Sequence, residues 1–374
     1  MSERSGPPFR ADQVGSLLRP PGLLRARAEN QAGRISAAAL RRAEDAAIGD
    51  AARMQAEIGL RGVTDGEFRR GSWHMDFLYR IGGVARIDQT LRLRFRNEAG
   101  TVEAALGAFR IAGKLSLVET IFGEDFAYLK SVLPAGTTAK LTIPSPSMLH
   151  YRGGRASIDP GVYPDMDEFW LDLARVYAQE IAALHALGCR YLQLDDTSLA
   201  YLNDPAQRAF VTAIGGDGDK QHLTNIRVIN AALAGRPAGM TVTTHMCRGN
   251  FRSSWMAEGG YDHVAEALFG ELVVDGFFLE YDDARSGGFA PLRFVPKGNK
   301  RVVLGLVTSK RAALETKDEL KRRIDEAAKY VPLDQLCLSP QCGFSSTVDG
   351  NALTIDEQNA KLRLVVETAR EVWG

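Results

Sequence analysis

A histidine and a cysteine two positions apart, His245 and Cys247, form a pattern that can hold a metal ion. They end the strand-like run of residues 241–244, and side chains two apart on an extended chain point to the same side. Glu280 ends a second apolar run, and Cys342 lies just beyond a third. If these runs are strands of one sheet, their ends bring one nitrogen, two sulfurs and one oxygen together.

That donor set is typical of zinc, which accepts imidazole, thiolate and occasionally carboxylate ligands. With a net charge of about −1, such a site makes zinc a weak Lewis acid toward water. We therefore expect activation of a thiol, whose ordinary pKa of about 8.5 falls when it binds a metal. The remaining cysteines, Cys189 and Cys337, stand in apolar surroundings and are predicted to pack in the interior.

Short apolar runs alternate with long amphipathic segments, as in parallel strands joined by helices. The predicted strands are residues 14–17, 62–65, 140–143, 191–195, 240–245, 276–281, 302–307 and 335–339. The clearest predicted helices are residues 37–58, 166–187, 317–330 and 355–372. The pattern predicts an α/β fold, a (β/α)8 TIM barrel formed by residues 1–374 as one domain, with a doubly wound sheet as the alternative. In a barrel, polar residues at the strand ends meet at one mouth.

Residues 82–113 depart from this alternation. Leu91, Leu93 and Phe95 alternate with basic residues, and residues 97–100 supply turn chemistry. We predict a β-hairpin inserted after the second barrel strand. It either covers the mouth of the site or decorates the surface.

The overall composition argues against several classes of function. The 374 residues include 46 Lys plus Arg and 46 Asp plus Glu, so the chain lacks the basic footprint of a nucleic-acid-binding protein. No stretch approaches the ~18 consecutive apolar residues of a membrane span. The first ten residues lack the apolar core of a signal peptide, and four cysteines are too few for a disulfide scaffold. A cytoplasmic location is therefore expected.

Several motifs resemble, in their order, those of the catalytic half of cobalamin-independent methionine synthase. The similarity is greatest to the short, single-barrel relatives of that enzyme and covers nearly the whole chain. The matching segments are residues 9–20, 65–67, 192–196, 245–247 and 340–343. The order of the H-x-C pair, the glutamate and the late cysteine is the most specific part of the match.

The resemblance implies a role for each matching residue. The ligands of Zn²⁺ would be His245, Cys247, Glu280 and Cys342. The homocysteine carboxylate would bind the backbone N–H groups of Val14, Gly15 and Ser16, with the Ser16 hydroxyl nearby.

Two carboxylates, Glu67 and Asp195, would bind the homocysteine ammonium group. Physical reasoning agrees, because two carboxylates at a barrel mouth need a cation. The alternative is that they pair with local arginines such as Arg69 and Arg70.

The sequence departs from the family pattern around the second substrate. Lys310 stands where the full-length synthases carry a histidine proton donor, and it could donate a proton or pair with an anionic group. Tyr201 stands where they carry a folate-binding carboxylate, and their folate-packing tryptophan has no clear counterpart in residues 144–151. His74 is a candidate proton carrier, with core packing as the alternative. The identity of the methyl donor therefore stays open.

The main prediction is a transferase similar to 5-methyltetrahydropteroyltriglutamate-homocysteine S-methyltransferase, which methylates homocysteine to methionine with zinc. Its donor would be a methylated folate, a methylcorrinoid protein or a small methyl compound. The alternative is an epoxyalkane:coenzyme M type of transferase, in which a thiolate opens an epoxide. Coenzyme M carries a sulfonate and no amine, so Glu67 and Asp195 favour an amino-acid thiol. A non-catalytic thiol-binding barrel is a third interpretation, and a homodimer is compatible with each.

Overall fold

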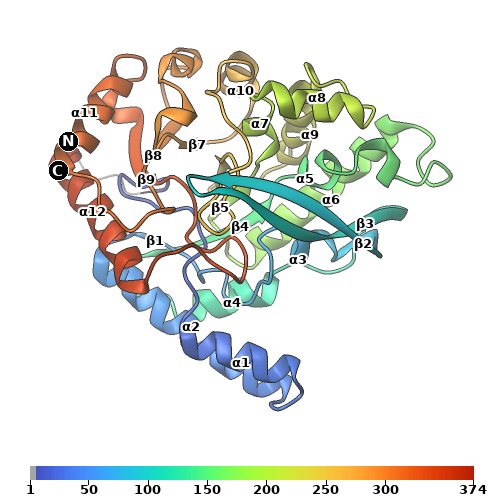
Figure 1. The fold of residues 1–374 in the computed structure, drawn as a ribbon, viewed down its shortest axis with the longest axis horizontal. Coiled ribbons are helices and arrows are strands. Elements are labelled where there is room, and N and C mark those ends of the chain that lie inside the picture. Colours follow the sequence, from blue (N-terminus) through green and yellow to red (C-terminus); the bar gives the residue numbers. More distant parts are fainter. Residues whose placement is uncertain (1–5) are drawn as a thin grey trace.

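The computed structural model describes residues 6–374, in which a curled parallel sheet is wrapped by helices (Figure 1). The sheet order is β1-β4-β5-β6-β7-β8-β9. These strands are β1 (Gly62–Val63), β4 (Thr138–Pro144), β5 (Tyr191–Asp195), β6 (Thr241–Met246), β7 (Gly276–Glu280), β8 (Arg301–Val307) and β9 (Leu336–Pro340). The order follows the chain, every pair is parallel and helices intervene, so the predicted TIM-barrel architecture is confirmed. The expectation about the first ten residues rests partly on residues 1–5, which lie outside the described residues.

The N-terminal segment lies between the two edge strands, β1 and β9. Ala11 forms a parallel bridge with Leu338 of β9, and the Asp12 N–H donates to the Leu338 carbonyl at 3.0 Å. On the other side, the Leu17 N–H donates to the carbonyl of Gly66, just after β1, at 3.1 Å. This segment therefore takes the place of the eighth strand of the barrel.

The predicted strand at residues 14–17 is wrong, because this stretch is irregular. The carbonyl oxygens of residues 13–15 accept hydrogen bonds from side chains instead of from a neighbouring strand. The donors are Lys140, Gln193 and Thr64, respectively. A β-ladder needs backbone hydrogen-bond partners on a neighbouring strand. Here side chains from inside the barrel bind the carbonyl oxygens that such a strand would bind.

Helices cover the outside of the sheet (Figure 1). The α-helices are α1 (Pro21–Gln31), α2 (Ala37–Ile58), α3 (Met75–Leu78), α4 (Gly123–Ser131), α5 (Met148–Tyr151), α6 (Met166–Ala186), α7 (Ser198–Tyr201), α8 (Pro205–Ala213), α9 (Gln221–Leu233), α10 (Ala265–Glu271), α11 (Lys317–Ala328) and α12 (Ile355–Trp373). The 3-10 turns are η1 (Gly154–Ser157), η2 (Ala284–Ser286), η3 (Ala290–Phe294) and η4 (Leu333–Gln335). Within residues 6–374, no helix has both the length and the apolar character needed to cross a membrane.

Local sequence signals explain where the long helices begin. The Ser36 side chain accepts a hydrogen bond from the Ala39 N–H at the start of α2. A reciprocal capping box starts α11 at Thr316, and another starts α12 at Thr354. Helix α2 ends at Gly59, whose φ of 104° is left-handed. The four predicted long helices are therefore confirmed to within two residues at each end.

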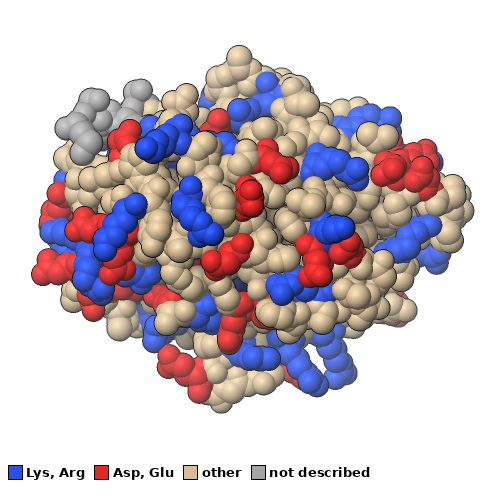
Figure 2. Space-filling view, turned by 90° about the horizontal axis from the view of Figure 1, so that it is seen from above, with Lys and Arg blue, Asp and Glu red and all other residues tan. Residues whose placement is uncertain are grey.

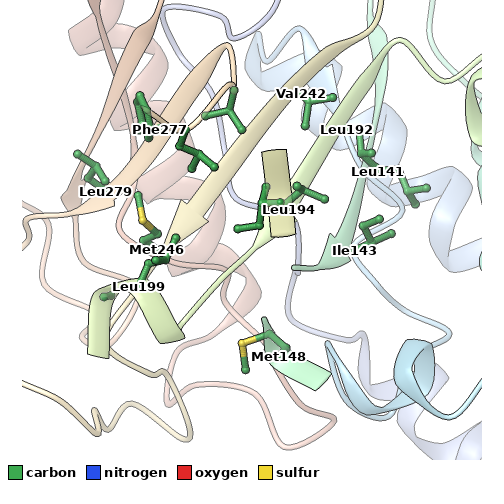
Figure 3. Close-up of a cluster of buried hydrophobic side chains, with 14 of the residues drawn as sticks. Leu141, Ile143, Met148, Leu192, Leu194, Leu199, Val242, Met246, Phe277 and Leu279 are labelled. Atoms are coloured by element: carbon green, nitrogen blue, oxygen red, sulfur yellow. The ribbon is translucent and has the colours of Figure 1, made fainter. Parts of the chain in front are cut away.

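The strands bury side chains on both faces. One face contributes to the cluster between sheet and helices in Figure 3, including Leu192 and Leu194 of β5. The alternate residues belong to the barrel interior, where Tyr191 lies in a second apolar cluster. The same alternation directs Gln193 and Asp195 to the interior face of β5. The register pairs Asp195 with His245 of β6, at the carboxyl ends of both strands.

A long antiparallel hairpin, β2 (Ile81–Asn97) and β3 (Gly100–Leu117), follows β1 and the short helix α3. It crosses in front of the strands in Figure 1. Arg96 and Trp255 exchange backbone hydrogen bonds of 2.7 and 2.8 Å, which fix the hairpin tip to the loop after β6. The predicted insertion over residues 82–113 is confirmed and extends somewhat further.

The charged side chains lie mostly on the surface. Figure 2 shows lysines and arginines interspersed with aspartates and glutamates over the face seen there. This distribution agrees with the balanced charge of the sequence.

An exception is the fully buried ion pair Lys140–Asp12, which has an N–O distance of 3.3 Å inside the barrel. Burial lowers the pKa of Lys140, and the charge of Asp12 opposes that effect. The Lys140 ammonium also lies 4.0 Å from the ring centre of Phe278. The pair therefore holds the N-terminal segment against the barrel wall.

We expect Lys140→Met to lower the free energy of unfolding by about 3–5 kcal/mol, because it leaves the Asp12 carboxylate buried without its cation. Urea denaturation followed by tryptophan fluorescence measures the change. The double variant Asp12→Asn/Lys140→Met should lose less than the sum of the two single losses. Unchanged stability of Lys140→Met would contradict the role of this ion pair.

Candidate metal centre and substrate cavity

Three of the four predicted metal ligands meet at the carboxyl end of the sheet. His245 ends β6, Cys247 follows it, and Cys342 follows β9. Their ligand atoms all lie within 4.8 Å of one another, and all three residues are buried. Strands β6 and β9 are not neighbours in the sheet, so its curvature brings them together. One imidazole and two thiols, shielded from water, fit the requirements of zinc.

Hydrogen bonds among the three side chains shift the pKa values of all three. Hydrogen bonding with Cys247 lowers the pKa of Cys342 to about 5, and His245 adds to this effect while burial opposes it. The same thiol–thiol contact raises the pKa of Cys247 well above its ordinary value. The group therefore stabilises negative charge on sulfur, as a cation-binding group must.

Asp195 orients the imidazole of His245. Its Oδ1 lies 3.2 Å from His245 Nδ1 and accepts a hydrogen bond from Gln193 Nε2 at 2.7 Å. Burial opposes a charge on His245, but hydrogen bonds to Asp195 and Cys342 raise its pKa to about 10. A carboxylate on one imidazole nitrogen is the usual way to direct the other nitrogen toward a metal.

Glu280, the fourth predicted ligand, lies nearby at the end of β7 but outside this group of three. Its Oε2 accepts from the backbone N–H of Arg248 at 2.6 Å. Its Oε1 accepts from Arg285 at 2.6 Å and from Lys310 at 3.0 Å. Burial opposes its charge, but Lys310 and Arg285 lower its pKa well below the usual range. Metal ligation by Glu280 stays a prediction, and it requires an exchange of these partners.

Lys310 is buried between two carboxylates. Its Nζ lies 3.0 Å from Glu280 and 2.9 Å from Asp282. Burial opposes its charge, but Asp282 and Glu280 raise its pKa above the ordinary value. It is absent from the described lining of the cavity. Proton donation by Lys310 therefore stays a prediction that requires the lysine to leave both carboxylates.

A cavity of about 530 Å³ opens beside the three candidate metal ligands. The predicted residues that line it are Val14, Ser16, Glu67, His74, Asp195, His245, Cys247 and Cys342. Hairpin side chains also line it, among them Leu91, Leu93, Phe95 and Phe109. Of the two interpretations of the hairpin, the cover over the site is confirmed. Gly15 lies behind this lining and packs against Thr142 and Glu67.

The segment of residues 14–16, of which Val14 and Ser16 line the cavity, carries backbone donors without acceptors in the described part of the chain. Among the described residues, no acceptor is found for the N–H groups of Val14, Gly15 and Ser16. Gly343, next to Cys342, packs so closely that an added Cβ would lie 2.0 Å from Ser16 Oγ. The irregular backbone of this segment therefore leaves three N–H groups beside the candidate metal centre. Such clustered N–H groups suit an anion.

Glu67 and Asp195 each keep one oxygen without a partner among residues 6–374. Thr142 donates to Glu67 Oε1 at 2.8 Å, and Arg70 forms an ion pair with the same oxygen at 3.6 Å, so the alternative of pairing with Arg70 is confirmed for this oxygen. The other arginine considered as a partner, Arg69, pairs elsewhere with Glu44, Asp45 and Asp125. For both carboxylates, the second oxygen has no hydrogen bond or ion pair.

The backbone at Glu67 is strained. Its φ of 58° is left-handed, which costs a residue with a Cβ roughly 1–2 kcal/mol. The Asp65 carboxylate stabilises this conformation by accepting the Glu67 N–H at 2.8 Å. Burial raises the pKa of Glu67 to about 7, although Arg70 opposes the shift. Strain and desolvation at one carboxylate are typical of a functional position.

His74 lies in the cavity wall and stacks on Trp73 with ring centres 4.4 Å apart. Burial, aided by the charge of Arg152, lowers the pKa of His74 to about 3. The imidazole is therefore neutral at ordinary pH and is a weak base. Its role as a proton carrier stays a prediction.

Sequence reasoning missed two features of the site. Arg152 lines the cavity, although nothing in its local sequence marks it. Arg285 holds Glu280, and its position in η2 becomes meaningful only once the strand ends have converged. No motif spans these distances, so no local signal could have found either arginine.

The sequence profile of the cobalamin-independent synthase catalytic domain matches residues 10–371. The chain belongs to this family. The motif-based resemblance and the predicted transferase class are thus confirmed at the level of the family.

Similar proteins cover nearly the full chain. The Bacillus subtilis protein YxjH is 47% identical over 366 residues, which are 98% of this chain and 95% of that protein. A crystal structure from Listeria monocytogenes, assigned as a vitamin-B12 independent methionine synthase, is 41% identical with a TM-score of 0.78 and covers 98% of both chains. The methionine synthase of Pyrococcus horikoshii is 25% identical over 88% of this chain and 85% of its own length.

We expect Cys247→Ser and Cys342→Ser to abolish stoichiometric zinc binding, because each removes one of two sulfur donors from a three-residue group. Elemental analysis of the purified variants measures bound zinc. Cys189→Ser is the matched control, since Cys189 is equally buried but contacts the Tyr191 carbonyl far from the group. Full zinc occupancy in either of the first two variants would contradict the assignment.

Proposed function

We propose that the protein is a zinc-dependent S-methyltransferase that converts homocysteine to methionine. The observation that carries the proposal is the meeting of three features in one cavity. These features are a buried His/Cys/Cys group, two carboxylates with free oxygens and three backbone N–H groups without acceptors. Each corresponds to one group of an amino-acid thiol: the sulfur, the ammonium and the carboxylate. Membership of the family supports the same substrate class.

Each end of homocysteine has a matching partner on this chain. The N–H groups of Val14, Gly15 and Ser16 would hold the carboxylate, and Glu67 with Asp195 would hold the ammonium. The side chains His245, Cys247 and Cys342 would hold zinc, with Glu280 as a fourth ligand. When bound, zinc lowers the pKa of a substrate thiol and keeps it as a nucleophilic thiolate at neutral pH.

Methyl transfer requires alignment more than acid–base chemistry. The substrate sulfur forms a bond to the methyl carbon, while the bond from that carbon to the donor breaks and its electron pair leaves with the donor. Fixing both ends of homocysteine restricts its sulfur to one position. Such positioning accounts for much of the rate acceleration of methyl transfer. The hairpin side chains Leu91, Leu93 and Phe95 cover the cavity and limit access of water.

The donor is proposed only as a class: a methylated folate, a methylcorrinoid protein or a small methyl compound. The coenzyme M alternative is less well supported, because Glu67 and Asp195 would face a thiol that has no ammonium group. A cytoplasmic location is proposed because Cys189, Cys247 and Cys342 are not joined in disulfides. The homodimer stays a prediction.

A thiol panel tests this proposal directly. We expect zinc-edge X-ray absorption of the zinc-loaded protein to show one added sulfur neighbour with homocysteine and none with 2-mercaptoethanesulfonate. Mass spectrometry for methionine, with methyltetrahydrofolate, methylcobalamin and simple methyl compounds as donors, then identifies the second substrate. An added sulfur with the sulfonate alone would reject the proposed acceptor.

We expect Glu67→Gln to weaken homocysteine binding by about 10–100-fold, the usual worth of a hydrogen bond between charged groups. Binding of 3-mercaptopropionate, which lacks the ammonium, should change much less. Titration calorimetry measures both thiols. Equal losses would contradict the ammonium contact.

The same carboxylate gives a pH dependence. Burial raises the pKa of Glu67 to about 7, so the carboxylate is mostly protonated and neutral below that pH. The advantage of homocysteine over 3-mercaptopropionate should therefore increase as pH rises through 7. Because both thiols share the same sulfur chemistry, the ratio of their affinities isolates this effect. In Glu67→Gln the ratio should vary much less with pH.

A further inference from the structure

Arg152 lines the substrate cavity without a carboxylate partner. No Asp or Glu oxygen of residues 6–374 lies within 4.0 Å of its guanidinium, and it is the one Lys or Arg in the described lining. Its Nη2 donates to Met256 Sδ at 2.8 Å. A thioether is a weak acceptor, and a guanidinium has five N–H donors. Most of its hydrogen-bonding capacity is therefore unused.

Other arginines near the site have several oxygen partners each among the described residues. Arg248 donates to four backbone carbonyls, and Arg285 pairs with Glu280. Arg70 donates to Thr142, and Arg19 donates to backbone carbonyls and to Ser345. These four position other parts of the protein. Arg152 differs because its guanidinium donates to a thioether sulfur and, among the described residues, to no carbonyl, hydroxyl or carboxylate oxygen.

Aromatic rings fix where the guanidinium of Arg152 lies. It is 5.1 Å from the ring centre of Tyr201 and 5.2 Å from that of Tyr151. An added Cβ on Gly249, two residues after Cys247, would lie 2.6 Å from the Tyr201 hydroxyl. The Tyr201 ring therefore spans the distance between the metal-binding loop and Arg152. His74 faces the same part of the cavity, since the charge of Arg152 acts on it.

Asp196, another acid in the cavity lining, already has hydrogen-bond partners on both oxygens. Ser147 and Ser198 donate to its two oxygens at 2.5 and 2.7 Å, and the Leu199 N–H donates at 2.9 Å. The proposed homocysteine carboxylate has its own partners in residues 14–16. An anion at Arg152 would therefore belong to a different molecule.

We propose that Arg152 is a specificity-determining residue that binds an anionic group of the second substrate, the methyl donor, beside Tyr201 and His74. This inference rests on the proposed function, because it assigns homocysteine to the other side of the cavity. The anionic group is a carboxylate, phosphate or sulfonate, which a guanidinium binds through paired N–H donors. A ring of apolar and aromatic side chains strengthens such a contact by excluding water.

Calorimetric titration of the zinc-loaded, homocysteine-saturated protein with acetate, inorganic phosphate or methanesulfonate tests the proposal. Wild type should bind at least one of the three, and the ranking among them identifies the anionic group. Arg152→Gln should weaken that binding by about tenfold or more, and Arg152→Lys should retain part of it. Arg110→Gln is the matched control, because it removes the same charge from the exposed pair Arg110–Asp159 on the hairpin and should bind as wild type does.

Three results would overturn the proposal. The first is equal anion binding by wild type and Arg152→Gln, and the second is no binding of any anion by wild type. The third is a loss of homocysteine affinity in Arg152→Gln as large as its loss of anion affinity, which would assign Arg152 to the thiol substrate. Homocysteine affinity and the zinc-edge sulfur signal should stay at wild-type levels in Arg152→Gln.

Failure of the proposed function gives a different result. In that case the zinc-edge absorption of wild type with homocysteine shows no added sulfur neighbour. Substitution of Arg152 does not change this result. If 2-mercaptoethanesulfonate adds the sulfur instead and Arg152→Gln abolishes that signal, Arg152 binds the thiol and both proposals fall. Normal homocysteine signals with anion binding that is independent of Arg152 would remove only the inference about Arg152.

Discussion

The candidate site depends on how the N-terminal segment closes the barrel. The buried Lys140–Asp12 pair and the bridge from Ala11 to β9 fix this segment between the two edge strands. Side chains from inside the barrel then satisfy the carbonyl oxygens of residues 13–15. Because no neighbouring strand pairs with this stretch, its N–H groups are left free at the cavity. A regular eighth strand would have used these donors in a ladder and left no place for a carboxylate.

The charged side chains around the candidate metal centre are of two kinds. Glu280 and its cations, Lys310 and Arg285, form a buried network in which positive and negative groups compensate each other. Glu67, Asp195 and Arg152 instead face the cavity with bonding capacity that no protein group uses. Burying such groups costs free energy unless a partner arrives, so the second kind indicates where ligands bind. This distinction separates Lys310 from Arg152, although both are cations close to the same site.

The hairpin and the barrel contribute different kinds of side chain to the cavity. The barrel supplies the polar groups at its strand ends, and β2 and β3 supply an apolar cover anchored through Arg96 and Trp255. The family's catalytic-domain profile matches residues 10–371 of this chain, and the hairpin lies within that range. The cover places Phe95 beside Gly249 and Tyr201, where the second substrate would lie. The shape of this part of the cavity therefore depends on the hairpin as well as on the barrel.

The sequence by itself determined the barrel, the long helices, the hairpin and the likeness of the metal motif to a known family. These features depend on local periodicity, on caps such as Ser36 and Thr354, and on short motifs such as His245-Met246-Cys247. Only the tertiary structure decided that residues 14–17 are irregular, that Glu280 is held by Lys310 and Arg285, and that Arg152 has no acidic partner. Each of these outcomes depends on groups far apart in the chain that compete for one another's hydrogen bonds. Local sequence carries no information about which of those groups meet.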